Sequence, residues 1–271
     1  MSNASRVLPK LVLCLVGDEK FPEIAEELLQ DEEVEFEIQR EADPRMVAAF
    51  RAAAALVNPT MDAAELAEIA QHRSVVYVVS GNYGPADAIH YAHEMLALGT
   101  QLLEAGAIGM KCESSGIAHS KEHWLKLAAV ADEQLEIASD EENDDDEAAI
   151  SAFADFWSAL VQAFVQTPLL TPDDYKTCGL HLLGVPDLIM SRDIIHELAH
   201  DEEQHDTEAA GLFLLVALTD LMQDRDEPLE QFDAFRLDDE SPEFQLRMEE
   251  CDDIPADDLF FNPYGRRRLV L

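Results

Sequence analysis

Positive charge is what this sequence has least of. Lysine and arginine together number 18, against 57 aspartates and glutamates, which gives a formal net charge of −39 at pH 7. Such a surface repels phosphate backbones and anionic membranes, so we expect neither nucleic acid nor a membrane as a partner. The charge indicates either an acidic face for a basic protein or for divalent ions, or a general adaptation to a salty cytoplasm where screening weakens self-repulsion. Composition alone does not separate these two alternatives.

Long apolar runs and paired cysteines are also missing. No apolar run reaches the roughly 18 residues that a membrane-spanning helix needs. The first residues lack the pattern of a secretory signal, so we expect a cytoplasmic protein. The four cysteines, Cys14, Cys112, Cys178 and Cys251, form no C-x-x-C pair. Their spacing argues against a zinc ribbon or a redox dithiol, and Cys14 is predicted to be a core thiol.

Hydrophobic residues, by contrast, make up 48% of the chain and follow the periods of strands and helices. The first part predicts strands at 11–16, 34–38, 53–57 and 75–79, and helices at 21–29 and 62–72, with Asp62 capping the second helix. The order βαββαβ is ferredoxin-like. We therefore predict an α+β fold of two related halves, the first ferredoxin-like. The halves are residues 1–84 and 85–271, with mixed or antiparallel sheets covered by helices.

The second predicted half contains helices at 85–104, 120–132 and 153–165. Strands are predicted at 107–112 and 244–248, and residues 177–189 are predicted as strand material. Residues 139–147 form a low-complexity acidic loop that lacks the central glycine and spaced ligands of an EF-hand. Arg266-Arg267-Arg268 is the only basic cluster, and we expect it to hold this part of the chain on an acidic surface.

The string His196-Glu197-Leu198-Ala199-His200 is the stretch that best indicates a particular reaction. On a helix, H-E-x-x-H places two imidazoles on one face, where they can hold Zn²⁺ with the glutamate beside a metal-bound water as general base. Under this hypothesis the metal ligands are His196, His200 and Asp206, with His205 as an alternative third ligand. Glu197 is then the catalytic base of a zinc-dependent hydrolase of the metalloprotease type.

The residues after His200 argue against a zinc site. They are Asp201-Glu202-Glu203-Gln204, which is typical of a solvated helix face, whereas a zinc-protease helix runs through the protein interior. The long form of the motif also requires a glycine where this chain has Glu203. An amphipathic helix with its leucines packed inward explains the segment without a metal. We therefore expect no cofactor, and zinc only if the hydrolase hypothesis holds.

A second constellation places Cys112 or Ser115 as a nucleophile with His119 as its base. No third residue that would orient the imidazole can be named, and no G-x-S-x-G elbow is present. The simpler interpretation is that Ser120 caps a helix and that His123 lies on the surface of that helix.

Two other patterns have simple structural interpretations. His90 and His93 are three residues apart on a predicted helix and could ligate a metal, but this spacing is more typical of surface or half-buried histidines. The segment Ser80-Gly81-Asn82-Tyr83-Gly84 loosely resembles an anion-binding turn. It lacks the Lys-Ser or Lys-Thr pair of a phosphate-binding loop, so we interpret it as a tight turn.

Three short motifs resemble a family. They are the E-A-G-A-I-G-M stretch that ends at Met110, the H-S-K-E-H-W-L helix start from His119, and Tyr175-Lys176-Thr177-Cys178-Gly179-Leu180 with the later Gly184. Together they resemble the bacterial domain-of-unknown-function family 4261, over roughly residues 10 to 271. The resemblance implies no established activity and no zinc motif.

The charge and the incomplete catalytic constellations lead to one main hypothesis. We predict an interaction or regulatory module without catalysis of its own, whose acidic surface binds a basic protein. The alternative is the zinc-dependent hydrolase that uses the H-E-x-x-H string.

Overall fold

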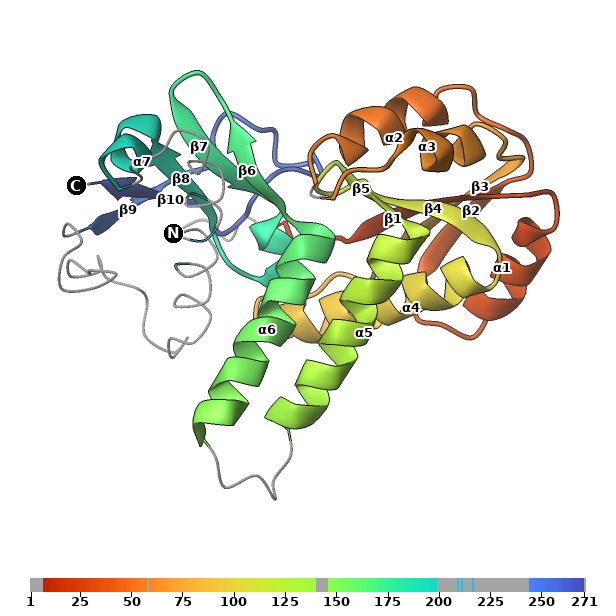
Figure 1. Ribbon diagram of the computed structural model, residues 1–271, viewed down its shortest axis with the longest axis horizontal. Coiled ribbons are helices and arrows are strands. Elements are labelled where there is room, and N and C mark those ends of the chain that lie inside the picture. The colour runs from red at the N-terminus through yellow and green to blue at the C-terminus, as the bar shows by residue number, and fades with distance from the viewer. Residues whose placement is uncertain are drawn as a thin grey trace.

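A computed structural model describes residues 7–57, 59–139, 146–198 and 244–270, together with Ala209, Gly211 and Val216. The chain is an α+β protein with two mostly antiparallel sheets (Figure 1). The first sheet has the strand order β2-β3-β1-β4-β5, and every neighbouring pair in it is antiparallel. Its strands are β1 (Val12–Gly17), β2 (Glu35–Gln39), β3 (Ser74–Val79), β4 (Ala107–Cys112) and β5 (Ile117–Ser120).

Helices pack on both faces of the first sheet, because β1 is apolar on both sides. Leu13 and Leu15 belong to one buried cluster, and Cys14 and Val16 belong to another. The first cluster includes residues of α1 (Phe21–Leu29) and α4 (Ala88–Glu104), and the second includes residues of α2 (Met46–Ala54) and α3 (Ala63–Ile69). In Figure 1, α2 and α3 accordingly lie above the sheet, while α1 and α4 lie below it. The prediction of Cys14 as a core thiol is confirmed.

The second sheet has the order β6-β7-β8-β10-β9. The β8–β10 pair is parallel, and the other pairs are antiparallel. Its strands are β6 (Gln166–Leu170), β7 (Asp174–Cys178), β8 (Asp187–Ser191), β9 (Gln245–Glu249) and β10 (Arg266–Val270). A short 3-10 helix, η1 (Leu180–Leu183), connects β7 to β8, and α7 (Arg192–Leu198) follows β8.

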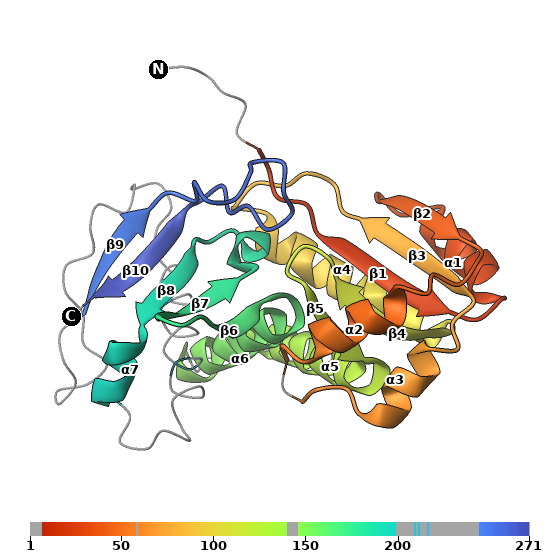
Figure 2. The same cartoon turned by 90° about the horizontal axis from the view of Figure 1, so that it is seen from above.

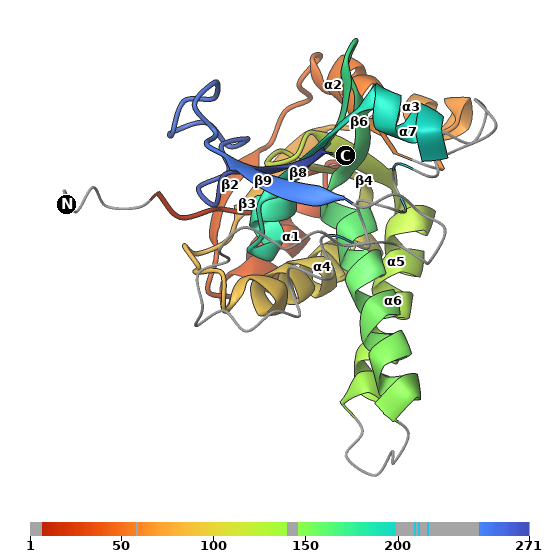
Figure 3. The same cartoon turned by 90° about the vertical axis from the view of Figure 1, so that its left-hand side faces the viewer.

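A hairpin of two long helices, α5 (Lys121–Ala138) and α6 (Asp146–Phe164), connects the two sheets along the chain. Its outer ends project from the body of the molecule (Figure 3). At its base, Trp124 of α5 contacts Phe164 of α6 edge to face, with ring centroids 5.5 Å apart. Gly99 of α4 faces the same indole, and an added Cβ there would lie 2.9 Å from it. The absence of a side chain at position 99 therefore lets α4 approach the hairpin closely.

Most of the predicted elements are confirmed within a few residues. Asp62 caps α3 through a capping box in which its side chain accepts from the backbone amides of Ala64 and Glu65. The predicted helix at 85–104 is α4, and the chain turns away from it at Gly106, where φ is +127°. Ser120 caps α5 by accepting a hydrogen bond from the amide of His123. The residues predicted as strands at 107–112 and 244–248 form β4 and β9.

Two predicted strand segments are wrong. Residues 53–57 are the end of α2 and the turn after it, because the alanine-rich sequence of Met46–Ala54 favours a helix over a strand. Residues 177–189 do not form continuous strand material. Gly179 and Gly184, with φ of +114° and +83°, interrupt the segment around η1 and separate β7 from β8.

The ferredoxin-like half at residues 1–84 is not confirmed. Without the strand predicted at 53–57, this range contributes β1, β2 and β3, and the same sheet continues through β4 and β5 beyond residue 84. A relation between two halves is not confirmed either, because the first sheet is wholly antiparallel and the second contains a parallel pair. Among the described helices, none is long and apolar enough to cross a membrane.

Candidate functional site

The H-E-x-x-H string falls where the structure describes only part of it. His196 is exposed on α7, and Glu197 lies on the same short helix. His200, His205 and Asp206 lie outside the described residues, so the structure does not test whether they converge on a metal. Within the described ranges, no group of three or more His, Cys, Asp or Glu side chains is placed to hold a metal ion. The zinc site stays a prediction.

The second constellation is a pair of histidines, His119 buried and His123 half-buried, without a nucleophile that can use it. His119, on β5, is 1% exposed. Its Nε2 lies 3.2 Å from the carbonyl oxygen of Ala163, to which it donates, and its Nδ1 lies 3.2 Å from Nδ1 of His123. The Nδ1–H of His123 then donates to His119, so both ring nitrogens of His119 have partners. His119 has no nitrogen left to act as a base toward Cys112 or Ser115.

Burial also works against the proposed nucleophile. Cys112 and Ser115 are both fully buried, and burial raises the pKa of the Cys112 thiol. A thiol reacts as the thiolate, so a raised pKa makes this cysteine inert. Burial, and then the neighbouring His123, lower the pKa of His119 to about 3. The pair therefore stays neutral and joins the start of α5 to the end of α6.

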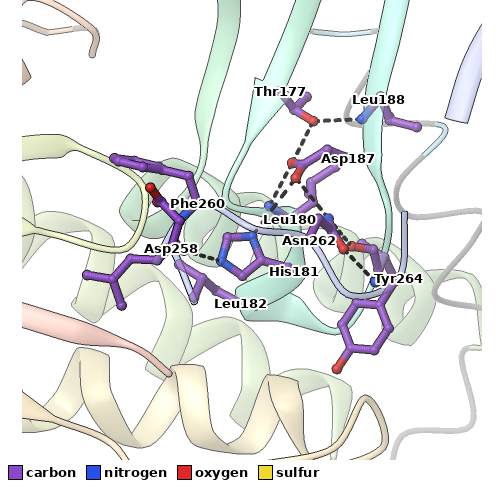
Figure 4. A network of polar contacts seen from close by, with 12 residues as sticks. Thr177, Leu180, His181, Leu182, Asp187, Leu188, Asp258, Phe260, Asn262 and Tyr264 are labelled. Atoms are coloured by element: carbon purple, nitrogen blue, oxygen red, sulfur yellow. Dashed lines mark hydrogen bonds and ion pairs between the residues drawn. The ribbon is translucent and has the colours of Figure 1, made fainter. Parts of the chain in front are cut away.

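A buried polar cluster around Asp187 was not predicted from the sequence (Figure 4). One carboxylate oxygen of Asp187 accepts hydrogen bonds of 3.1 Å from the Thr177 hydroxyl and from the backbone amide of Leu180. The other oxygen accepts a 2.8 Å bond from the side-chain amide of Asn262 and lies 3.9 Å from Nδ1 of His181. The residues Thr177, His181, Asp187 and Asn262 are 1–6% exposed. This cluster holds the segment before β10 against β7 and β8, out of reach of a substrate.

The arginine cluster also has a structural role. Arg266 pairs with Asp253 at 2.6 Å, and Arg268 pairs with Glu249 at 2.7 Å and with Asp174 at 3.0 Å. The prediction that the arginine cluster holds this part of the chain on acidic residues is confirmed for Arg266 and Arg268, while Arg267 is buried.

A groove on the first sheet's side of the molecule has the composition of a binding site. It encloses about 440 Å³ between the loop after α1 and the exposed side of α4. Four carboxylates line it, those of Asp31, Glu32, Glu33 and Glu94, and all four residues are exposed. Among the described residues that line it there is no lysine or arginine, and His90 is paired with Glu94 at 3.2 Å. We call this cavity the acidic groove.

Apolar side chains lie between the carboxylates of the acidic groove. Val34 and Tyr91 are half-buried there, and Met95 and Leu98 are buried. Tyr91 stacks on Tyr83, with ring centroids 5.1 Å apart and an interplanar angle of 14°, so its position is fixed. Acidic groups above an apolar surface suit a ligand with a cationic head on an aliphatic stem.

Sequence reasoning missed the groove because its two walls are far apart in the chain. The acidic run at 31–33 is visible in the sequence, but nothing local indicates that α4 lies beside it. Gly81, from the segment predicted as an anion-binding turn or a tight turn, also lines the groove. An anion is disfavoured there because the neighbouring carboxylates repel it. The other predicted histidine, His93, is half-buried and bonds Asp132 at 2.8 Å.

Comparisons with known proteins give no match: no family model, no curated protein and no solved structure resembles this chain. The resemblance to domain-of-unknown-function family 4261 stays a prediction.

Proposed function

We propose that this protein is a binding module without catalysis of its own, and that the acidic groove takes a basic segment of another protein. The observation that carries the proposal is the set of four exposed carboxylates around an apolar surface, with no lysine or arginine among the described lining residues. A lysine or arginine side chain can lay its aliphatic stem on Val34 and Leu98 and hold its charge among the carboxylates.

The whole-chain charge supports the same proposal. With a net charge of −39, the surface attracts cationic partners over a distance set by the salt concentration, which speeds encounter. Each exposed ion pair stabilises a complex by only about 0.2–1 kcal/mol, so four pairs in one groove are needed for a specific preference. The groove concentrates them in one place.

The fold that supports the groove is, we propose, a ferredoxin-like unit that is larger than the predicted one. Two crossover units, β1-α1-β2 and β3-α4-β4, interleave in the antiparallel order β2-β3-β1-β4, which supports this proposal. In this view α2 and α3 are an insertion between β2 and β3. The acidic groove then lies between the loop that follows the first crossover helix and the second crossover helix.

The proposal is tested with a fluorescent lysine-rich peptide and two variants that carry the same charge change. The groove variant combines Asp31→Asn, Glu32→Gln, Glu33→Gln and Glu94→Gln. The control variant neutralises four exposed carboxylates elsewhere, those of Glu104, Glu133, Glu136 and Asp252. Fluorescence anisotropy at low salt should show about tenfold or more weaker binding for the groove variant, because four lost pairs amount to about 2 kcal/mol.

The control variant should bind within about twofold of the native protein at the same salt. Equal loss in both variants would show that the peptide responds to total charge rather than to the groove. Unchanged binding in the groove variant would reject the proposed function.

A further inference from the structure

β2 is an edge strand with one unpaired side. It pairs with β3 from Glu35 opposite Val79 to Gln39 opposite Val75, and no other described strand pairs with it. Figure 2 shows β2 at the margin of the first sheet, on the far side from the second sheet. An open edge presents backbone N–H and C=O groups that another chain can pair with.

The side of β2 that faces α1 carries apolar groups that are incompletely covered. Phe36 lies opposite Val78, which belongs to the buried cluster on that face, yet Phe36 is 38% exposed. Ile24 of α1, a helix that contacts β2, is 40% exposed. A strand added beside β2 would place its own side chains next to Phe36 and would remove this apolar surface from water.

The opposite side of β2 is acidic. Glu35 and Glu37 alternate with Phe36 and are both exposed, and the acidic run of the groove immediately precedes the strand. Cross-strand neighbours on this side would therefore be lysine or arginine. A second copy of the chain fits poorly, because pairing two β2 edges would place glutamates opposite glutamates. Charge thus selects the occupant of the edge.

The groove and the edge are continuous. Val34 lines the acidic groove and is followed directly by Glu35, the first residue of β2. We propose that the partner's basic segment is an extended strand that adds to β2 with lysine or arginine alternating with apolar residues, and that basic residues beyond the end of this strand enter the acidic groove. This proposal rests on the proposed function and specifies how the basic partner is held.

The test uses an eight-residue peptide of alternating lysine and valine, together with two N-methylated forms. In one form the lysine nitrogens are methylated, and in the other the valine nitrogens are methylated. A strand at a sheet edge bonds that edge through alternate residues only, so methylation of one set removes those bonds and methylation of the other set does not. We expect the two forms to differ in affinity by at least about tenfold, since several backbone hydrogen bonds are lost in only one of them.

Two further readouts belong to the same experiment. The amides of Glu35–Gln39 should exchange with deuterium more slowly when the unmodified peptide is bound. Phe36→Ser should weaken binding by about fivefold, because apolar contact with the peptide is lost. Ile150→Ser, which changes an isoleucine that is 56% exposed on α6, should leave binding unchanged.

Equal affinity of the two methylated forms, with no protection of β2, would overturn strand addition. If the groove variant still lost binding in that case, the proposed function would stand and only the mode of binding would be wrong. If the groove variant bound as the native protein does, the proposed function itself would fail, whatever the methylated peptides showed.

Discussion

Apolar residues of both sheets belong to one buried cluster, and the second sheet adds a buried polar network to this packing. In the first sheet, β1 is buried on both faces by apolar side chains, with Leu13 and Leu15 on one side and Val16 on the other. In the second sheet, the parallel β8–β10 pair lies beside a buried polar cluster, in which Asn262 bonds Asp187 across 75 positions of the chain. Packing of apolar groups is non-directional, whereas hydrogen bonds require particular partners in particular places.

These contacts also bear on the order of strands in each sheet. In the first sheet, most strands are positioned by the packing of their apolar side chains. Many well-packed arrangements would bury these side chains equally well. In the second sheet β10 lies between β8 and β9, far from β8 in the sequence, and three of its residues are arginines. The ion pairs of Arg266 with Asp253 and of Arg268 with Asp174 and Glu249 fit this one arrangement. We infer that polar partners select the position of β10.

The substitution Asp187→Ala tests the role of the polar cluster and should have the largest effect on stability. The change leaves the donors of Thr177, Leu180 and Asn262 buried without their acceptor. We expect the free energy of unfolding to fall by about 4 kcal/mol, since each unsatisfied buried donor costs roughly 1–3 kcal/mol. Urea unfolding followed by circular dichroism measures this. The control is Asp257→Ala, at an exposed position of the loop between β9 and β10. An equally small effect of both changes would show that the polar cluster does not stabilise the second sheet.

The matching test in the first sheet is Leu15→Ala. Leu15 is fully buried, and shortening its side chain leaves a cavity, so we expect a loss of about 3 kcal/mol in the free energy of unfolding. Leu56→Ala, at a leucine that is 40% exposed, should cost less than about 0.5 kcal/mol under the same urea titration. A loss at Leu15 below about 1 kcal/mol would show that apolar packing is not what holds the first sheet.

A smaller effect on the free energy of unfolding is expected at His119, a buried polar group of the first sheet. Its pKa is lowered from 6.5 to about 3, so the unfolded chain binds a proton more readily than the folded protein. The contribution of the neutral imidazole is therefore complete above pH 6.5 and declines as the pH falls toward 3. Other groups titrate in this range as well, so the measurement is the difference between the native protein and His119→Gln.

Between about pH 6 and pH 4, the native protein should lose stability more steeply than His119→Gln, by roughly 1.4 kcal/mol per pH unit. The free energy of unfolding at a series of pH values gives both slopes. Parallel profiles would mean that His119 accepts a proton in the folded state without penalty.

The sequence predicted best those elements that depend on local pattern. The alternation from Val34 to Ile38 indicated β2, and Asp62 indicated the start of α3, because each signal lies within a few residues of the element itself. The prediction of a strand at 53–57 was wrong because a short apolar run rich in alanine fits a helix end as well as a strand. β10 was predicted only as a basic cluster, because its strand character depends on pairing with β8 and β9.

The candidate site was harder to predict than the fold. The charge of the chain led to the hypothesis of a basic partner, but it did not indicate where such a partner would bind. The acidic groove needs both Glu33 and Glu94, which are brought together only when α4 packs beneath the sheet. The Asp187 cluster likewise needs a residue from before β10 and residues from β7 and β8. Contacts between such distant segments leave no local signal.

The two sides of α4 differ in the side chains that they can accept. His90, Glu94, Ala97 and Gln101 form a stripe that lines the acidic groove, while Gly99 lies against Met110 and Trp124 and admits no larger side chain without displacing them. Substitutions along the stripe change the lining of the groove and leave the interior intact. Under the proposed function, a few changes on one helix would therefore change the partner without a change of the fold.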